Sequence, residues 1–246
     1  MESATPVETA AHRSDARRRH EAERPWYRFA ARLLPEDAAR AGRWVDLGCG
    51  QGEFLELAAA ARGLAGLGLD YWRSNARAGA RLGRPALAAD LNRALPFRDA
   101  SLDGATLIEV VEHIVRAEDL LAELARVIRP GGWLVLTTPN VAHLTYRWRA
   151  LTGHPPKQEG YHYRFFTKRT LAEALEAAGF RRVARASFGK QSLASRLGRL
   201  LGRGPEYKLR YRVPAPAESL LAQHFVWRLE RRPGPGFISP NRSRTP

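Results

Sequence analysis

The sequence predicts an α/β fold, with a mainly parallel sheet covered by helices on both faces. Between residues 43 and 137, short apolar segments alternate with segments of helical period, which is the pattern of βαβ units. Glycines follow the first apolar segment, and acidic residues follow the next two. Ligands bind at such strand ends in open parallel sheets, so these residues mark the expected binding edge.

The expected elements alternate along the chain, after short helical pieces in residues 25–40. Strands are expected at Arg43–Leu47, Leu64–Leu69, Ala86–Ala88, Ala105–Ile108 and Trp133–Thr137. Helices are expected at Glu53–Arg62, Arg73–Leu82, Ala117–Ile128 and Leu171–Ala178. We expect one domain at residues 25–232, between polar tails at residues 1–24 and 233–246 that we expect to be disordered.

Composition sets broad limits on the class of protein. The chain has 246 residues, of which 44% are hydrophobic, and a single cysteine, Cys49. One cysteine excludes a disulfide framework and favours a reducing, cytoplasmic setting. No apolar run approaches the roughly 20 residues needed to cross a bilayer, and we expect no secretory signal.

The net charge of +15 is concentrated near the end of the chain, where residues 181–246 carry 15 Lys and Arg against 3 Glu. This region is either a solvated basic surface or a patch that attracts phosphate or anionic lipid headgroups. The sequence leaves both interpretations open.

The loop after the first strand carries the first chemical signal. Asp46 ends the strand, and Gly48, Gly50 and Gly52 follow at alternate positions before a helix begins. Dinucleotide sites use G-x-G-x-x-G to seat a pyrophosphate, whereas this loop is G-x-G-x-G followed by the acidic Glu53. Acidic side chains suit a cationic ligand, so the loop favours S-adenosylmethionine (SAM) over NAD.

Acidic residues also follow the second and third strands. Asp70 is placed to accept hydrogen bonds from ribose hydroxyls, and Tyr71 can pack near an adenine. Asp90 can receive an adenine amino group, while the backbone N–H of Leu91 meets a ring nitrogen. Asp70 is common to SAM and NAD sites, so these residues indicate an adenosine ligand without choosing between the two.

An ordered series of motifs resembles class I SAM-dependent methyltransferases, in particular the small-molecule branch that includes ubiquinone-pathway O-methyltransferases. The motifs are Val45–Gly52, Gly-Leu-Asp70, Ala-Asp90-Leu, Leu95-Pro-Phe97, Ser101-Leu-Asp103, Glu109-Val-Val-Glu-His113 and Leu124–Gly132. The resemblance covers roughly residues 40–232. It implies a Rossmann-like sheet of seven strands with an antiparallel last strand, residues 180–188 and 224–229 being the last two strands and residues 189–222 a variable insertion between them.

The resemblance also implies which residues contact SAM. The predicted cofactor residues are Asp46, Gly48, Cys49, Gly50 and Gly52 for the methionine part, Asp70 for the ribose, Tyr71, Asp90 and Leu91 for the adenine, and Glu109 as a lining residue.

Transfer of a methyl group to a hydroxyl benefits from a general base. His113 lies near the expected pocket, and His162 lies in a segment expected to cover the mouth of the site, where His162 or Arg164 can contact substrate. Both histidines can equally be structural. The seven histidines show no close pairing along the chain, so we expect no metal site.

The acceptor is expected to be a small molecule or a glycan-like or lipid-linked compound, methylated at oxygen. Residues 139–157 and 189–222 are expected to select it, and residues 192–201 form a leucine stripe, either a packed helix or one that contacts a membrane surface. A nucleic-acid methyltransferase using the basic C-terminal region is disfavoured because no RNA-binding module is visible. A non-catalytic SAM-binding protein also stays open.

Overall fold

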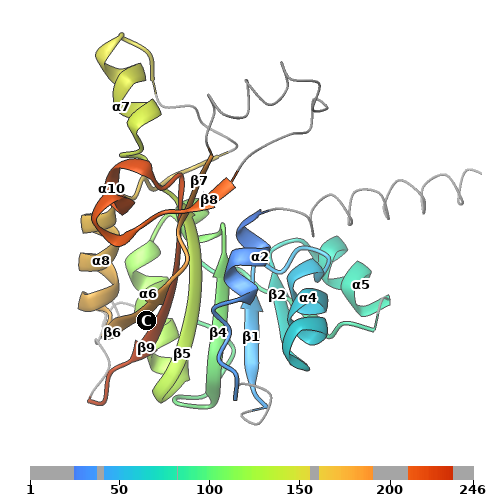
Figure 1. The fold of residues 1–246 in the computed structure, drawn as a ribbon. Coiled ribbons are helices and arrows are strands. Elements are labelled where there is room, and N and C mark those ends of the chain that lie inside the picture. Colours follow the sequence, from blue (N-terminus) through green and yellow to red (C-terminus); the bar gives the residue numbers. More distant parts are fainter. Residues whose placement is uncertain (1–24, 38–41, 82, 156–160, 191–209, 235–246) are drawn as a thin grey trace, which may run out of the picture.

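The computed structural model describes residues 25–37, 42–81, 83–155, 161–190 and 210–234, which form a central sheet with helices on both faces (Figure 1). The strands are β1 Trp44–Leu47, β2 Leu67–Asp70, β3 Ala86–Ala88, β4 Leu102–Ile108, β5 Ile128–Pro139, β6 Phe180–Arg185, β7 Phe188–Lys190, β8 Arg210–Arg212 and β9 His224–Arg231. The helices are α2 Pro25–Ala31, α4 Glu53–Arg62, α5 Arg73–Arg81, α6 Ala117–Val127, α7 Leu144–Leu151, α8 Lys168–Ala177 and α10 Glu218–Leu221, with short 3-10 helices η1 Val111–His113 and η2 Ala215–Ala217.

The strand order confirms the expected Rossmann-like fold. Strands β3, β2, β1, β4 and β5 are neighbours in that order and are parallel. Strand β9 pairs antiparallel with both β5 and β6, so the last strand along the chain lies inside the sheet. The seven expected strands are present, and the short strands β7 and β8 extend the sheet further.

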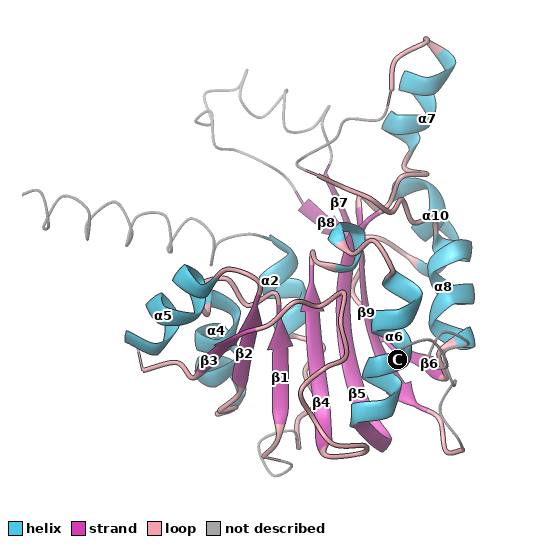
Figure 2. Ribbon diagram, turned by 180° about the vertical axis from the view of Figure 1, so that it is seen from behind, coloured by secondary structure: helices cyan, strands magenta, loops and turns pink. Residues whose placement is uncertain are grey.

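Alternation of side chains along the strands builds a hydrophobic core on each face. In β5, Leu134 and Leu136 join the core cluster that includes α6 and α8, whereas Trp133 and Val135 join the cluster that includes α2 and α4. Figure 1 shows α2 and α4 in front of the sheet, and Figure 2, from behind, shows α6 and α8 on the other side. Strands buried on both faces explain the near-continuous apolar runs in the sequence.

Several element boundaries differ from the sequence prediction. The expected helix 117–128 ends at Val127, because Ile128 already has extended backbone angles and opens β5. The expected sixth strand, residues 180–188, is divided into β6 and β7 at Ala186 and Ser187. There the Val226 N–H donates to the Ser187 hydroxyl at 3.2 Å, so a side chain replaces one bond of the ladder. The expected helix at residues 192–201, the expected tail at residues 1–24 and all but the first two residues of the expected tail at residues 233–246 lie outside the described residues.

The end of the insertion is fixed to the sheet by the buried carboxylate of Glu218. Its Oε1 atom accepts hydrogen bonds from Ser187 Oγ and from Trp227 Nε1, the latter at 2.9 Å. Its Oε2 atom lies 3.4 Å from Lys168 Nζ and 3.6 Å from an Arg182 guanidinium nitrogen. Glu218 therefore joins α10 to β6, β9, α8 and the residues between β6 and β7.

Helix α7 stands away from the sheet in both ribbon views (Figures 1 and 2), and none of its residues is buried. In the described part of the chain, no helix combines the length and apolar character needed to span a membrane.

Candidate functional site

The glycine loop between β1 and α4 lies at the carboxyl edge of the sheet. The backbone N–H groups of Gly48 and Cys49 both donate to the carbonyl of Leu69, at 2.7 and 3.0 Å. These bonds hold the loop against the end of β2, where the sequence places the next acidic residue. The backbone of the loop is therefore fixed by hydrogen bonds to β2.

Two of the loop glycines are required by sterics as well as by backbone conformation. Gly48 has a φ of +72°, and a Cβ there would lie 2.4 Å from Cγ2 of Val110. Gly52 has a φ of +88°, and a Cβ there would lie 2.7 Å from Cδ of Arg84. Side chains rarely adopt these angles, so neither position accepts one without strain. The close contact also places Val110, just after β4, directly against the glycine loop.

Three acidic side chains, Asp46, Glu53 and Asp70, are buried around this loop. Asp46 Oδ1 accepts a hydrogen bond from Thr106 Oγ1 at 2.6 Å. The pKa of Asp46 is raised to about 7, mainly by burial; the Thr106 bond acts to lower it, and the nearby Glu53 and Asp70 charges act to raise it. Buried carboxylates are costly unless a positive charge compensates them. This end of the loop is therefore suited to a cationic ligand.

Asp70 connects the loop to the end of β2. Its Oδ2 atom accepts from the Gly50 N–H at 2.9 Å, and its Oδ1 atom accepts from the Trp72 N–H at 2.8 Å and from Asn75 Nδ2 at 3.0 Å. A carboxylate oxygen accepts about two hydrogen bonds. Asp70 can therefore position the loop and still accept a bond from a ligand hydroxyl through Oδ2.

Cys49 is a predicted cofactor residue whose side chain points away from the edge. Its sulfur packs against β2, at 2.5 Å from where a Cβ on Gly68 would lie. Burial and the neighbouring acidic groups raise the pKa of the Cys49 thiol. Only the backbone of Cys49 is therefore placed to contact a ligand.

The residues predicted for the adenosine part lie farther along the same edge. Tyr71 and Trp72 are 63% and 64% exposed, and their rings meet edge-to-face with centroids 5.2 Å apart. Asp90 accepts from the backbone and side-chain nitrogens of Asn92 at 3.0 and 3.1 Å, and the backbone bond is the main cause of its lowered pKa. Leu91 is buried in the core, so its side chain supports the edge from below. The sequence reasoning missed Trp72, although an aromatic pair directly after Asp70 was visible.

Glu109 follows β4 in a strained backbone conformation, with a φ of +55°. Thr137 Oγ1 accepts from the Glu109 N–H at 2.9 Å and donates to Glu109 Oε1 at 2.7 Å. Nδ1 of His224 lies 2.9 Å from Glu109 Oε2, at ion-pair distance but outside hydrogen-bonding geometry. Strain of this kind persists where the surrounding structure fixes it, often at functional sites.

His224 and Trp26 were not predicted to be near this site. His224 begins β9 opposite Pro139 at the end of β5, and its ring stacks on Trp26 of α2 with centroids 5.1 Å apart. The antiparallel direction of the last strand could have indicated His224, because that direction brings the start of β9 to the carboxyl edge. No sequence signal indicated Trp26.

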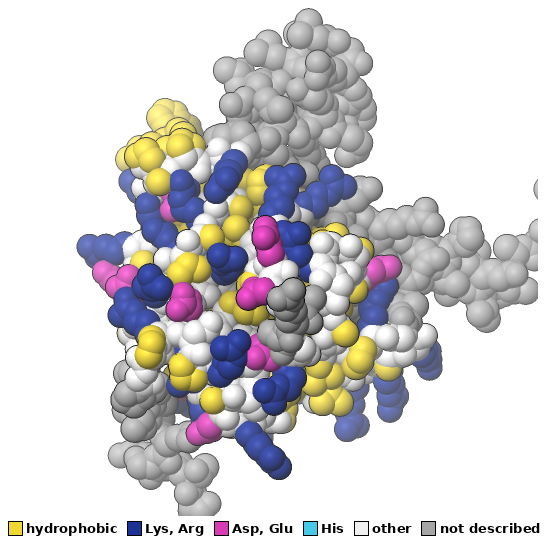
Figure 3. Space-filling model, turned by 60° about the horizontal axis from the view of Figure 1, so that its bottom comes forward, with side chains coloured by type: hydrophobic (Ala, Val, Ile, Leu, Met, Phe, Trp, Pro, Cys, Tyr) yellow, Lys and Arg dark blue, Asp and Glu magenta, His cyan; other side chains and the backbone are white. Residues whose placement is uncertain are grey.

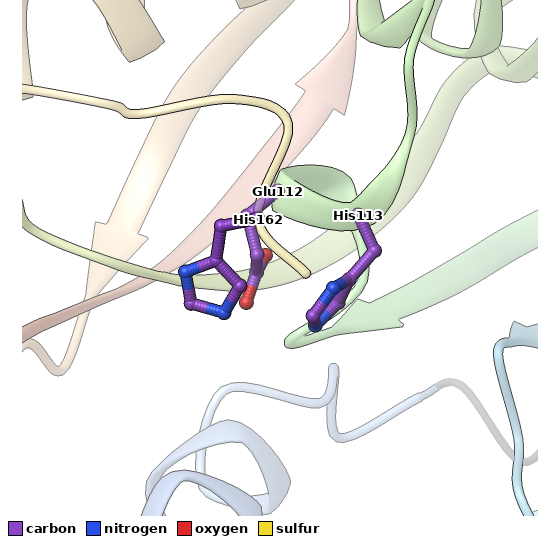
Figure 4. A group of neighbouring side chains, drawn as sticks. All are labelled: Glu112, His113 and His162. Atoms are coloured by element: carbon purple, nitrogen blue, oxygen red, sulfur yellow. The ribbon is translucent and has the colours of Figure 1, made fainter. Parts of the chain in front are cut away.

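A second cluster lies next to Glu109 and consists of Glu112, His113 and His162 (Figure 4). Glu112 is buried, and its Oε2 atom accepts from Thr138 Oγ1 at 3.0 Å. Burial and the nearby Glu109 carboxylate raise the pKa of Glu112 well above its usual value. The centroids of the His113 and His162 rings are 4.8 Å apart, although the two residues are far apart along the chain.

The two histidines that the sequence offers as candidate bases therefore lie together with a third group, Glu112. The sequence assigned no role to Glu112. Arg164, the other expected substrate contact, donates from Nε to the Val115 carbonyl at 3.2 Å and pairs with Glu118. Its guanidinium is thus engaged in holding the segment that carries His162.

A groove of about 660 Å³ opens at the opposite edge of the sheet, near the start of β5 and the end of α4. Arginines 32, 62, 129 and 228 and the acidic residues Glu36, Asp37 and Glu230 line it. Figure 3 turns this end forward and shows basic and acidic side chains interleaved. None of the predicted site residues lines this groove, and mixed charges do not make it a basic patch.

Comparison with known proteins agrees with the geometry. The model of the family described as a methyltransferase domain matches residues 18–185. A probable S-adenosylmethionine-dependent methyltransferase of Mycolicibacterium smegmatis is 34% identical over 162 residues, which cover 64% of this chain and 60% of that protein. An O-methyltransferase of Aspergillus sclerotiorum is 31% identical over 56% of this chain and 54% of its own length.

The chain thus spans little more than half the length of these two relatives. Among solved structures, a SAM-dependent methyltransferase of Archaeoglobus fulgidus superposes with a TM-score of 0.59, over 87% of this chain and 94% of that one, at 22% identity. Identity this low carries the fold alone.

Proposed function

The chain belongs to the methyltransferase-domain family, and from this premise we propose that it transfers a methyl group from SAM to an oxygen atom of a small-molecule acceptor. SAM is the cofactor of this family, and it supplies an electrophilic methyl group on a positively charged sulfur. The observation that carries the proposal is the set of buried carboxylates, Asp46, Glu53 and Asp70, around a loop held against β2. We assign the function to a domain at residues 25–232.

In this proposal the glycine loop receives the amino-acid part of SAM. Asp46 and Glu53 provide negative charge for the cationic ligand. The missing Cβ of Gly50 lets it approach the backbone, while Gly48 and Gly52 leave room for Val110 and Arg84 against the loop. Asp70 accepts from a ribose hydroxyl through Oδ2. Asp90, the backbone of Leu91 and the aromatic pair after Asp70 bind the adenine.

The methyl transfer needs an acceptor aligned behind the methyl group. The new C–O bond forms as the C–S bond breaks, its electron pair stays on sulfur, and the acceptor O–H loses its proton. We propose His113 or His162 as the group that takes this proton, since an imidazole has a pKa suited to that role near neutral pH. Glu109 lines the space between the glycine loop and these histidines.

A small-molecule acceptor is supported by the O-methyltransferase among the relatives, and we assign its selection to residues 139–157 and 189–222. A glycan-like or lipid-linked acceptor is supported by α7, which exposes large apolar side chains that such an acceptor can contact. Trp148 and Leu151 of this helix are 67% and 82% exposed. A nucleic-acid substrate is less well supported. Arg185 donates to the Val213 carbonyl and Arg231 to the Ile128 carbonyl, so part of the basic C-terminal region serves the fold. The single buried cysteine favours a reducing, cytoplasmic setting.

Calorimetric titration with S-adenosylhomocysteine tests the cofactor site. We expect saturable binding by the wild type and at least about tenfold weaker binding by Asp70→Ala, because the variant loses the ribose acceptor and the bond to the Gly50 N–H. Asp99→Ala is the matched control, since Asp99 pairs with Arg126 away from the loop. Absence of binding by folded wild-type protein would refute the proposal. Once binding is established, acceptor hydroxyl and amine panels with labelled SAM test the oxygen preference.

A further inference from the structure

We propose that Glu112, His113 and His162 form a binding site for a divalent transition-metal ion beside the methyl-transfer site. The binding itself follows from the cluster and does not depend on the proposed function. Only the role of the ion, given below, rests on that function.

The geometry brings three ligands of different kinds together. One donor atom from each of the three side chains lies within 4.8 Å of the other two, and Figure 4 shows both rings beside the carboxylate. An ion bound at about 2.1 Å in tetrahedral geometry needs donor atoms about 3.4 Å apart. Side-chain rotations that draw the donors together by at most about 1.4 Å are sufficient for that.

The hydrogen bonds around the cluster orient two of the ligands. His113 Nδ1 lies 2.8 Å from the Tyr161 carbonyl oxygen, which can only accept, so Nδ1 carries the proton and Nε2 keeps its lone pair. Thr138 Oγ1 donates to Glu112 Oε2 and fixes the carboxylate. Metal-binding histidines and carboxylates have second partners of this kind, which set their tautomer and orientation.

Main-chain contacts hold the two halves of the cluster together. The N–H groups of Tyr163 and Arg164 donate to the Glu112 carbonyl at 2.9 and 3.1 Å. Farther along, Phe166 forms a bridge with Asn140 at the end of β5. The segment that carries His162 is thus attached directly to the short helix η1 that carries Glu112 and His113, and the ligands are held before an ion arrives.

The charge and chemistry of the ligands indicate the kind of ion. Glu112 is 2% exposed, and a buried carboxylate is stabilised by a nearby cation. Two imidazoles and one carboxylate suit Zn²⁺ and similar transition metals, whereas Mg²⁺ and Ca²⁺ prefer oxygen ligands. Three protein ligands also leave at least one position open for a substrate oxygen, as in catalytic zinc sites.

The position of the cluster connects it with the reaction. Glu112 is two residues from Val110, which contacts the position of Gly48 in the glycine loop. An acceptor hydroxyl at the open position would have its pKa lowered by the ion and would release its proton to solvent water. With the ion bound, His113 and His162 are its ligands and position the acceptor through it, and this role replaces the proton transfer proposed above for one of them.

Cobalt provides a direct spectroscopic test with the full chain after treatment with a chelator. We expect one equivalent of Co²⁺ to give visible absorption bands that Zn²⁺ abolishes by displacement. His113→Ala and His162→Ala should each weaken Co²⁺ binding at least about 100-fold, since loss of a ligand costs at least as much as loss of its second partner. His154→Ala is the matched control, because His154 is exposed and, among the residues that the structure describes, its ring bonds locally to Thr152.

Titration with S-adenosylhomocysteine in the same variants separates this proposal from the proposed function. We expect cofactor binding to stay within about twofold of wild type, which shows that the variants are folded. Metal binding that survives in both histidine variants, or that His154→Ala weakens equally, would overturn the metal site and leave the methyltransferase proposal intact. Metal binding without any cofactor binding would support the site and refute the function.

Discussion

At the scale of single residues, Asp46 in the ligand-free protein keeps its proton to a higher pH than an exposed aspartate does. Its pKa of about 7 in the folded chain, against 3.8 for an ordinary aspartate, means that the folded state binds more protons than the unfolded state between about pH 4 and 7. The contribution of Asp46 to the stability of the ligand-free protein therefore falls as pH rises through this window. A pKa difference of one between the folded and unfolded states corresponds to about 1.4 kcal/mol in the free energy of unfolding.

We expect Asp46→Asn to lose less stability than the wild type between pH 5 and 8, measured by urea unfolding at each pH. Asn cannot ionise and can still accept the Thr106 hydrogen bond. Parallel stability curves for the two proteins would contradict the assignment of the raised pKa to Asp46.

Gly48 tests whether the shape of the loop matters as much as its charge. A Cβ at Gly48 meets Val110 at 2.4 Å, whereas a Cβ at Gly63 meets nothing within 4 Å, and both glycines have positive φ. We expect Gly63→Ala to cost about 1 kcal/mol through backbone strain alone. We expect Gly48→Ala to cost more and to weaken S-adenosylhomocysteine binding at least about tenfold, as measured by calorimetry. Equal effects of the two substitutions on binding would show that Val110 yields without moving the loop.

The sequence could predict the residues at strand ends but not the cluster beside them. Asp46, Asp70 and Asp90 lie in the last residues of three consecutive parallel strands or just after them, so their common edge follows from the βαβ pattern. His162 reaches Glu112 through main-chain contacts of an irregular segment, and no periodicity encodes such contacts. The stacking of Trp26 on His224 could not be predicted from the sequence for the same reason.

At the scale of elements, strand and helix types were predictable where apolar periodicity is strong, and their ends were less so. The β6–β7 break depends on the hydroxyl of Ser187, which accepts from the backbone of β9 and donates to Glu218. Such a partner, 31 residues away along the chain, does not appear in a local pattern. The contact between α10, at the end of the insertion, and the sheet could not be predicted from the sequence for the same reason.

We expect Glu218→Ala to destabilise the protein by about 3–5 kcal/mol, because it leaves Trp227 Nε1 without its acceptor and removes the buried negative charge beside Lys168 and Arg182. Glu230→Ala is the control, since the Glu230–Arg181 pair is exposed and pairs of that kind contribute about 1 kcal/mol or less. Chemical denaturation measures both. A Glu218→Ala cost no larger than that of Glu230→Ala would mean that α10 is not anchored through this carboxylate.

At the scale of the whole molecule, the glycine loop joins β1, β2 and the segment after β4, so a ligand bound there should stabilise the domain as a unit. S-adenosylhomocysteine at 100 times its Kd contributes about 2.7 kcal/mol by mass action. For a chain of this size that corresponds to a rise in Tm of roughly 5–10 °C. Differential scanning fluorimetry checks this, with Asp70→Ala expected to show little rise. A wild-type Tm that is unchanged at saturation would contradict a site formed by the folded domain.

The interior position of β9 has a consequence for biosynthesis. The ribosome makes β5 and β6 before β9, yet these two strands meet in the sheet only through β9. Until residues 224–231 emerge, a nascent chain has two strand edges awaiting the same partner, and exposed edges of this kind invite pairing with other chains. The sheet is thus completed late in synthesis. We expect the yield of native protein to depend on how well the unpaired edges of β5 and β6 are protected from other chains until β9 is made.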